Sequence, residues 1–299
     1  APGPRRLFVT GGGGLLGSAL VPLAREAGWI VTAPTSAEFD VRDAAAVDTA
    51  IAAMAEEAEV IHDVDDVDQA EAIGDTDDRP QRSDGPRVAI AHLAYRRDER
   101  DTIVDGSANV ARAAARHGVR LVHLSTDALF AGRPEPYTEA DRPDPVHDYG
   151  RWKTEAERAV AEACPDAVLV RTSLMYRGDG TSACALDVRR ALDGTSSIRF
   201  FTDEVRCFTH VADVAAGVLR LAELPGVSGP LHVAAAEPID RAGFARLVTA
   251  RLGVDPVAVP TSTIAASGLD RPGRVVLDVS AAADLGITCR AVSAVLSAP

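Results

Sequence analysis

Residues 5–17 read RRLFVTGGGGLLG, and this stretch decides the fold. Arg5–Thr10 is a short apolar run of strand-forming residues, and an apolar helical pattern follows the glycines. Gly11, Gly14 and Gly17 form the pattern G-x-x-G-x-x-G between strand and helix. The first glycine permits a tight turn, the second lets a diphosphate approach the backbone, and the third lets helix and strand pack closely. Because the helix N-terminus adds amide donors and partial positive charge, the stretch predicts a dinucleotide-binding turn.

Further along the chain, short apolar runs alternate with helical patterns. This alternation predicts an α/β protein with a doubly wound parallel sheet, the Rossmann arrangement, covered by helices on both faces. The expected strands are Arg5–Thr10, Trp29–Ala33, Val88–Leu93, Val119–Ser125, Ala167–Thr172 and Pro230–Ala234. The expected helices are Leu15–Ala27, Ala44–Ala58, Thr102–Arg116, a helix from Lys153 to about Ala163, Val211–Leu224 and Arg241–Leu252. We expect residues 1–172 to form the dinucleotide-binding domain. Residues 173–299 are expected to form a small C-terminal substrate-binding lobe, with some segments returning to the core.

Residues 56–86 interrupt this rhythm with an acidic stretch that is rich in Gly and Pro. We interpret the stretch as a surface insertion, because Val88–Leu93 leads into the expected next helix. The alternative is that Glu59–His62 is itself a core strand.

The formal net charge is −13, which argues against nucleic acid as a partner. An anionic ligand therefore needs a local positive site. The four cysteines and seven histidines show no metal-ligand spacing, so we expect no metal and reduced thiols in a cytoplasmic protein. With no apolar run of membrane-spanning length and no signal-peptide pattern, we expect no membrane association. The sequence leaves a homodimer open as the assembly.

Lys153 is the single lysine among 31 basic residues, so its position is expected to need an amine. Tyr149 precedes it by four residues, which places both side chains on one helical face. An ammonium near a phenol stabilises the phenolate and lowers the tyrosine pKa. This pair predicts a general acid for a carbonyl oxygen that receives hydride, or a base for an alcohol that loses it. The alternative is an ordinary exposed Tyr/Lys pair.

Ser125, Thr126 and Asp127 follow the expected strand that ends near residue 125. Ligands of open parallel sheets bind at the carboxyl ends of strands, so a hydroxyl here can face the same carbonyl as Tyr149. We choose Thr126 for that hydrogen bond and Ser125 as the second candidate. A simple strand-end cap is the alternative.

The sequence does not decide between NAD and NADP. The second strand ends in Ala33-Pro34-Thr35-Ser36, which offers neither an acidic residue for ribose hydroxyls nor an arginine for a 2′-phosphate. Thr35 and Ser36 suit either cofactor, and Asp40 is placed to reach the adenine or to cap the following segment.

Several ordered motifs together resemble the extended short-chain dehydrogenases. They are Gly11–Gly17, His92-Leu93-Ala94, Ser125-Thr126-Asp127 and Tyr149–Lys153. Within that family, residues 124–132 (LSTDALFAG), 137–143 (YTEADRP), 271–274 (RPGR) and 277–280 (LDVS) are similar to segments of dTDP-4-dehydrorhamnose reductases. The resemblance spans most of the chain, with residues 56–86 excluded.

The resemblance implies an NAD(P)-dependent oxidoreductase that reduces a nucleotide-activated 4-keto sugar. It implies Thr126, Tyr149 and Lys153 as catalytic residues and a cofactor lying across the glycine turn. The full set of expected cofactor-binding residues is Gly11, Gly14, Leu15, Leu16, Gly17, Thr35, Ser36, Asp40, Val41, Leu93, Ala94, Tyr149 and Lys153. The expected substrate-binding residues are Ser125, Asp127, Ala128, Arg206 and Arg271, and Arg274 is a further arginine that could hold a diphosphate.

One departure from the family pattern bears on the reaction. Ala128 stands where the reductases carry an aromatic residue and where dehydratases carry the glutamate that removes a ring proton. This argues against a dehydratase. An epimerase uses the same Thr/Tyr/Lys set and stays open, as does another ketone reductase or a non-catalytic subunit that keeps fold and cofactor.

Overall fold

The computed structural model describes residues 4–70 and 87–297. The chain divides into two compact units. The first unit comprises Ala1–His123, Arg158–Val168 and Val218–Gly229, and the second comprises Leu124–Glu157, Leu169–Gly217 and Pro230–Pro299. Each unit is described separately below.

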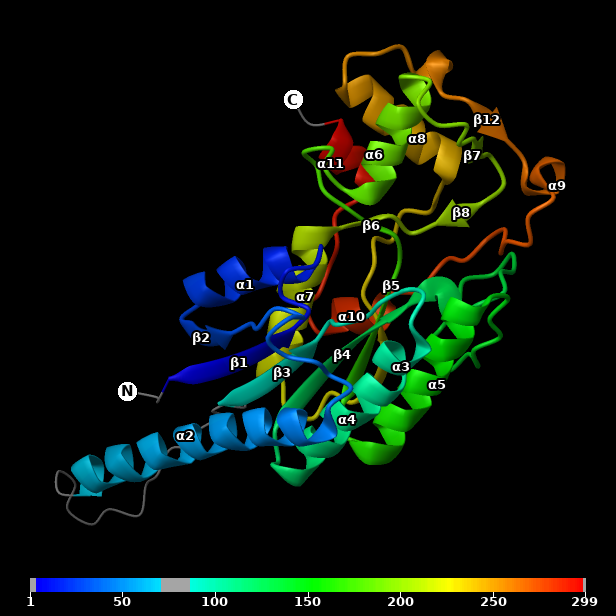
Figure 1. Ribbon diagram of the computed structural model, residues 1–299. Helices are drawn as coiled ribbons and strands as arrows, with labels where there is room; N and C mark the ends of the chain where they lie inside the picture. Colours follow the sequence, from blue (N-terminus) through cyan, green and yellow to red (C-terminus); the bar gives the residue numbers. More distant parts are fainter. Residues whose placement is uncertain (1–3, 71–86, 298–299) are drawn as a thin grey trace. The chain divides into compact units, whose positions relative to one another are not determined.

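The central sheet has six strands in the order β10-β5-β4-β3-β1-β2 (Figure 1). These strands are β1 (Arg5–Thr10), β2 (Trp29–Thr32), β3 (Val88–His92), β4 (Arg120–Thr126), β5 (Val168–Thr172) and β10 (Gly229–His232). β1 pairs in parallel with both β2 and β3, and β3 pairs in parallel with β4. The chain therefore turns from one side of β1 to the other between β2 and β3, which makes the carboxyl ends of β1 and β3 a topological switch point. The expected α/β fold with a doubly wound parallel sheet is confirmed.

The helices of the first unit cover both faces of its strands. In Figure 1, α1 (Gly17–Glu26) lies on one side of β1 and β2, and α2 (Ala44–Ala70) and α4 (Asp105–Arg116) lie together on the other. Strand residues such as Val9, Ile90 and Ala91 are fully buried, which explains their continuous apolar runs.

Two expected elements differ from the structure. The helix expected to end at Ala58 continues to Ala70, so the first part of the acidic stretch is helical, because its residues include none that breaks a helix. The remaining residues 71–86 of the expected insertion lie outside the described residues. β3 is the core strand and Glu59–His62 is helical, so the alternative of a core strand at Glu59–His62 is wrong. The helix expected over Thr102–Arg116 is split into α3 (Arg100–Ile103) and α4 around Val104.

The second unit begins with the end of β4 and carries helix α5 (Asp148–Ala163) up to Glu157. A core of buried apolar residues, including Tyr176, Phe208 and Phe244, organises its C-terminal part. Helix α7 (Val211–Glu223) belongs to this unit only up to Gly217. The remaining elements are η1 (Asp127–Leu129), β6 (Met175–Tyr176), α6 (Ala183–Leu192), β7 (Phe200–Phe201), β8 (Val205–Arg206), β9 (Thr209–His210), β11 (Ile239–Asp240), α8 (Arg241–Arg251), η2 (Pro256–Ala258), β12 (Thr261–Ser262), α9 (Ile264–Ser267), α10 (Ser280–Asp284) and α11 (Val292–Leu296). The short strands pair as β6–β9, β7–β12 and β8–β11.

Candidate functional site

The glycine turn lies at the switch point of the first unit. Gly11 has φ +70°, and a Cβ there would lie 2.9 Å from the Cα of Ala94 at the end of β3. A Cβ on Gly17 would lie 2.5 Å from the carbonyl oxygen of Gly11. Neither position accepts a side chain, because backbone atoms fill the space. The turn is therefore held tightly against the end of β3. Its glycines place no side chain between the backbone and the neighbouring cavity.

That cavity has a volume of about 460 Å³ and is lined by the segments that follow β1, β2 and β3. Expected cofactor residues that line it are Gly11, Gly14, Thr35, Ser36, Asp40, Val41, Leu93 and Ala94. The other expected cofactor residues, Leu15, Leu16, Gly17, Tyr149 and Lys153, are not in its lining, and Leu16 is buried in the core. The cavity is also lined by residues outside the expected cofactor-binding set, which are Thr10, Gly13, Pro34, Phe39, Arg42, Tyr95, Arg96, Glu99 and Thr102.

A buried hydrogen-bond chain fixes the strand ends beneath this cavity. The Oγ1 atom of Thr10 accepts hydrogen bonds from the backbone N–H groups of Leu93 (3.1 Å) and Ala94 (3.2 Å). Its own hydrogen then goes to Nδ1 of His92, 2.7 Å away, so Nε2 of His92 carries the proton and donates to Ser107 Oγ at 3.1 Å. The chain fixes the orientation of the His92 ring and holds β1 to the start of the Ala94 segment. Apart from the His92-Leu93-Ala94 motif, no sequence pattern indicated this arrangement.

The expected catalytic hydroxyl lies at the end of β4 in the second unit. Thr126 is half-buried, and its Oγ1 accepts the backbone N–H of Ala128 at 3.1 Å. Ser125 is buried, and its Oγ has no hydrogen-bond partner among the residues that the structure describes. Asp127 is buried, accepts a hydrogen bond from Ser173 Oγ at 2.6 Å, and has a pKa raised by burial. Two hydroxyl groups are therefore available at this strand end.

Tyr149 lies in the first turn of α5 and is half-buried. A Cβ on the next residue, Gly150, would lie 2.2 Å from the carbonyl oxygen of Ala128. The absent side chain lets the first turn of α5 approach the η1 segment directly. Gly150 thus sets the position of Tyr149 relative to the segment that follows Thr126, a role that the sequence pattern did not show.

Lys153 is buried, with 3% of its surface exposed, and its Nζ donates to the backbone oxygen of Leu124 at 2.9 Å. Burial lowers its pKa to about 8, while the nearby carboxylate of Glu157 acts in the opposite direction. A buried lysine is costly in free energy, so an ordinary surface pair with Tyr149 does not describe this residue.

The lower part of α5 is fixed to β5 by a buried ion pair. Arg171 donates to both carboxylate oxygens of Glu157, at 3.1 and 2.8 Å, and both side chains are almost fully buried. Bidentate geometry of this kind defines the orientation of the helix as well as its position.

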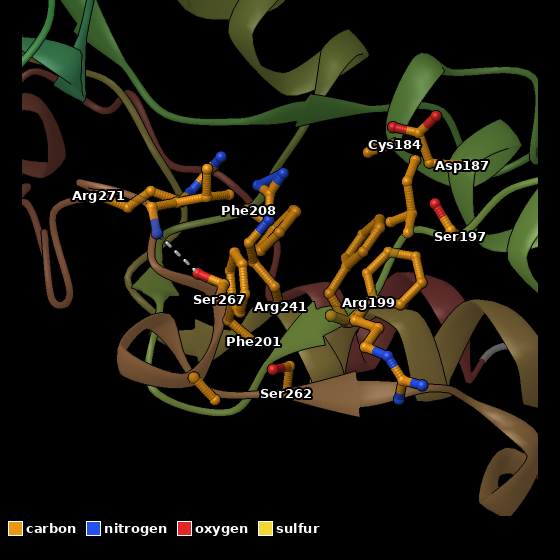
Figure 2. Close-up of a pocket in the computed structure, with 15 residues that line it drawn as sticks. Cys184, Asp187, Ser197, Arg199, Phe201, Phe208, Arg241, Ser262, Ser267 and Arg271 are labelled. Carbon is orange, nitrogen blue, oxygen red and sulfur yellow. Dashed lines mark hydrogen bonds between the residues drawn. The ribbon is translucent and has the colours of Figure 1, made fainter.

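A second cavity, of about 590 Å³, lies within the second unit (Figure 2). Its lining holds Arg199, Arg241 and Arg271, the aromatic residues Phe200, Phe201, Phe208 and Phe244, and the single carboxylate of Asp187. Phe208 and Phe244 are stacked, with ring centroids 4.0 Å apart. In Figure 2, Arg271 and Arg199 approach from opposite sides of the cavity. Positive charge beside aromatic rings suits a planar base that carries phosphates.

A buried glutamate organises these arginines. Glu204 is 1% exposed and accepts two hydrogen bonds from Arg271, at 2.7 and 3.1 Å, while Arg206 and Arg241 lie 3.4 and 3.7 Å from it. Burial lowers the pKa of Arg241. Three guanidinium groups thus surround Glu204, and the buried carboxylate of Asp127 lies 3.8 Å from the guanidinium of Arg206.

The expected substrate arginines are placed differently from one another. Arg271 lines the second cavity. Arg206 is buried, donates to the backbone oxygens of Val205 and Pro272, and does not line the cavity. Arg274 donates to the backbone oxygen of Pro134. Arg199 and Arg241, which do line the cavity, belong to no sequence motif and are far apart in the chain.

The structure also bears on cysteines and membrane segments. Cys164 and Cys207 are buried, Cys184 and Cys289 are partly buried, and each has a free thiol. Within residues 4–70 and 87–297, no helix combines the length and the apolar character that crossing a membrane requires.

A family model described as "RmlD substrate binding domain" matches residues 5–100 and 89–296. The dTDP-4-dehydrorhamnose reductase of Mycobacterium tuberculosis (strain CDC 1551 / Oshkosh) is 34% identical over 260 residues, covering 85% of this chain and 78% of the relative.

Two solved structures share the fold. The dTDP-4-dehydrorhamnose reductase from Bacillus anthracis, solved in complex with NADP, has a TM-score of 0.76 and 22% identity, with 98% of this chain and 97% of that chain covered. The Bordetella bronchiseptica enzyme WbmG, in complex with NAD and UDP, has a TM-score of 0.73 and 21% identity, with 96% and 91% covered. On the family model and the curated relative, this chain belongs to the RmlD substrate-binding-domain family.

Proposed function

We propose that this chain is an NAD(P)H-dependent reductase of a nucleotide-activated 4-keto sugar. The names of the M. tuberculosis relative and of the B. anthracis structure support this reaction class. The observation that carries the proposal is Lys153, a buried amine four residues after Tyr149 on one face of α5, with a pKa near 8. Buried groups with strongly shifted pKa values concentrate at functional sites.

The first cavity fits a dinucleotide. Its glycine turn offers bare backbone at the switch point, where a Cβ on Gly11 or Gly17 would collide with other backbone atoms. Gly11 and Gly14 would hold the diphosphate, Thr35 and Ser36 the adenosine ribose, and Leu93 and Ala94 the far wall. When bound in its reduced form, the dinucleotide supplies a hydride for the sugar carbonyl carbon.

The chain's own residues supply the proton. Tyr149 donates its phenolic proton to the C4 oxygen as that oxygen gains negative charge. Lys153 in its ammonium form stabilises the phenolate that remains. Thr126, with Ser125 beside it, donates a hydrogen bond that holds the C4 oxygen in place. The sugar carbonyl is thereby reduced to an alcohol, and the dinucleotide is oxidised.

The second cavity supplies the binding of the nucleotide part of the substrate. Arg271, Arg241 and Arg199 give it the local positive charge that a diphosphate needs on a chain of net charge −13. Its phenylalanine rings offer stacking surface for the base. Arg206 acts indirectly. Its guanidinium donates hydrogen bonds to the backbone oxygens of Pro272 and Gly273, and so holds the segment that carries Arg271 next to β8.

An epimerase is the second candidate, because it would use the same three side chains. The two reactions differ in redox balance: a reductase consumes one reduced dinucleotide per sugar, and an epimerase consumes none. Ala128, rather than glutamate, follows Asp127, which again disfavours a dehydratase.

The direct test is a panel of nucleotide 4-keto sugars, assayed for oxidation of NADH and of NADPH. We expect turnover of at least one member and a loss of about 10²- to 10⁴-fold in kcat for Tyr149→Phe, since the proton donor is removed. Tyr176→Phe is the matched control, because the Tyr176 hydroxyl is buried without a hydrogen-bond partner among the described residues and should be dispensable. Unchanged kcat in Tyr149→Phe would show that the proton donor is assigned wrongly.

A further inference from the structure

A buried arginine joins the segment that follows β4 to the second cavity. Nε of Arg206 lies 3.8 Å from the carboxylate of Asp127, and its Nη2 lies 3.4 Å from the carboxylate of Glu204. All three side chains are more than nine-tenths buried, and all three belong to the second unit. Both carboxylates have further partners, since Ser173 donates to Asp127 at 2.6 Å and Arg271 donates to both oxygens of Glu204.

Asp127 opens the short η1 segment, and that segment holds the hydroxyl of Thr126. Oγ1 of Thr126 accepts the backbone N–H of Ala128 at 3.1 Å, and the N–H of Phe130 donates to the backbone oxygen of Asp127 at 3.1 Å. The first turn of α5 meets the same segment, because Gly150 lies directly against Ala128. A shift of η1 would therefore move the Thr126 hydroxyl and the contact surface of α5 together.

The other end of this link is the segment that carries Arg271. Arg206 donates to the backbone oxygen of Pro272 at 2.8 Å, and Glu204 accepts the side chain of Arg271. The backbone oxygen of Glu204 accepts the N–H of Arg241 at 3.0 Å. Arg241 and Arg271 both line the second cavity (Figure 2). A group bound by these two arginines is thus connected to η1 through buried side chains.

Stability alone does not account for the charges at this place. An apolar group of similar volume often stabilises a protein interior as well as a buried ion pair does, because the ions lose their hydration. A guanidinium adds fixed geometry, since its planar set of donors meets its acceptors in one orientation. Arg206 contacts two carboxylates and three backbone oxygens at once, so it fixes several segments relative to one another.

We propose that Arg206 is a positioning residue, which holds η1 and the Thr126 hydroxyl in a fixed place relative to the arginines of the second cavity. The proposal rests on the proposed function, because it takes Thr126 as the donor to the sugar carbonyl and the second cavity as the nucleotide site. Nucleotide binding then places the C4 oxygen at the hydroxyl, and the binding free energy is expressed in kcat.

The first test needs no turnover. Hydrogen–deuterium exchange of the full chain is followed by mass spectrometry in peptides that contain Ala128 and Phe130. The variants are Arg206→Lys, which keeps the charge and loses the planar donors, and Asp127→Asn, which keeps an acceptor for Ser173. We expect these peptides to exchange about tenfold faster in both variants, because η1 loses its anchor and opens more often. The C-terminal half of α8, which packs in the core of the second unit, is the internal reference and should not change.

Arg246→Lys is the matched control. Arg246 is exposed on α8, so its replacement should leave the exchange of η1 unchanged. Exchange of η1 at the unaltered rate in both Arg206→Lys and Asp127→Asn would overturn the proposal. An equal acceleration of η1 and of the α8 reference would overturn it as well, since that would show a general loosening of the unit.

The second test separates positioning from nucleotide binding. Because Asp127 does not line the second cavity, Asp127→Asn should bind UDP and dTDP within about twofold of the unaltered chain, while its kcat on a nucleotide 4-keto sugar falls about tenfold. In a Thr126→Val background, Arg206→Lys should cost little further kcat, because the group through which it acts is gone. Additive losses in kcat would contradict the proposal. If the unaltered chain reduced no keto sugar, the proposed function would fail, and the exchange experiment would still decide whether Arg206 holds η1.

Discussion

At the scale of single residues, the account depends on a buried amine. Lys153 was singled out by composition alone, and the structure explains why arginine has not replaced it: the side chain is buried and ends on the backbone oxygen of Leu124. Its spacing from Tyr149 was readable from the sequence because a helix has a fixed period. The hydrogen bond between Thr10 and His92 was not readable, because strand pairing brings these two residues together.

Replacing Lys153 by methionine should separate stability from activity. Lys153 has a pKa of about 8 in the folded chain and near 10.5 when unfolded, so the unfolded state binds more protons between these values. The stability of the unaltered chain therefore rises as the pH increases from 8 to 10.5, and the cost of burying the charge is present in full below pH 8. That cost is at most about 3 kcal/mol. The variant avoids it, but part of this gain in stability is lost because the Leu124 oxygen no longer accepts a hydrogen bond from the lysine.

We accordingly expect Lys153→Met to unfold at an equal or higher temperature than the unaltered chain at pH 7, and this advantage to shrink above pH 8. Its kcat should fall about 10²-fold or more, because the phenolate loses its stabilising charge. Thermal unfolding across pH 6–10 and steady-state kinetics provide the measurements. Marked destabilisation at pH 7 would mean that the lysine serves structure rather than chemistry.

At the scale of elements, the apolar periodicity of the sequence predicted the strands and most helices. It did not predict where a helix is extended or interrupted. The extension of α2 to Ala70 and the interruption at Val104 depend on side chains without strong turn signals. The placement of α5 is decided by two contacts between distant residues, Gly150 against Ala128 and Arg171 with Glu157. Sequence reasoning could predict the helix but not what fixes it.

Gly150→Ala should move the first turn of α5 and with it Tyr149. The new methyl group would meet the Ala128 carbonyl oxygen at 2.2 Å, while the Arg171–Glu157 pair holds the helix further down. We expect kcat to fall by about 10²-fold through misplacement of the proton donor, with little change in NADH affinity. Gly178→Ala is the control, since a Cβ there meets its neighbours at an ordinary 3.7 Å. Equal kcat values for the two variants would remove Gly150 from the account.

At the scale of the whole molecule, the family segments predicted the first cavity better than the second. The glycine turn and the segments after β2 and β3 are each short motifs, so their convergence follows from the sheet order. The second cavity draws its lining from residues between Cys184 and Arg271, whose only common feature is the tertiary fold. This is why Arg271 was found from its motif and Arg199 and Arg241 were missed.

The proposed reaction is a hydride transfer to one carbon of the sugar, and isotope transfer tests this most directly. NADH carrying deuterium at its transferable position would be incubated with the protein and a nucleotide 4-keto sugar, and the product analysed by NMR and mass spectrometry. The account predicts one deuterium per product molecule, bonded to C4, and essentially no labelled product with Tyr149→Phe. Turnover that leaves C4 unlabelled, or places the deuterium on another carbon, would contradict it.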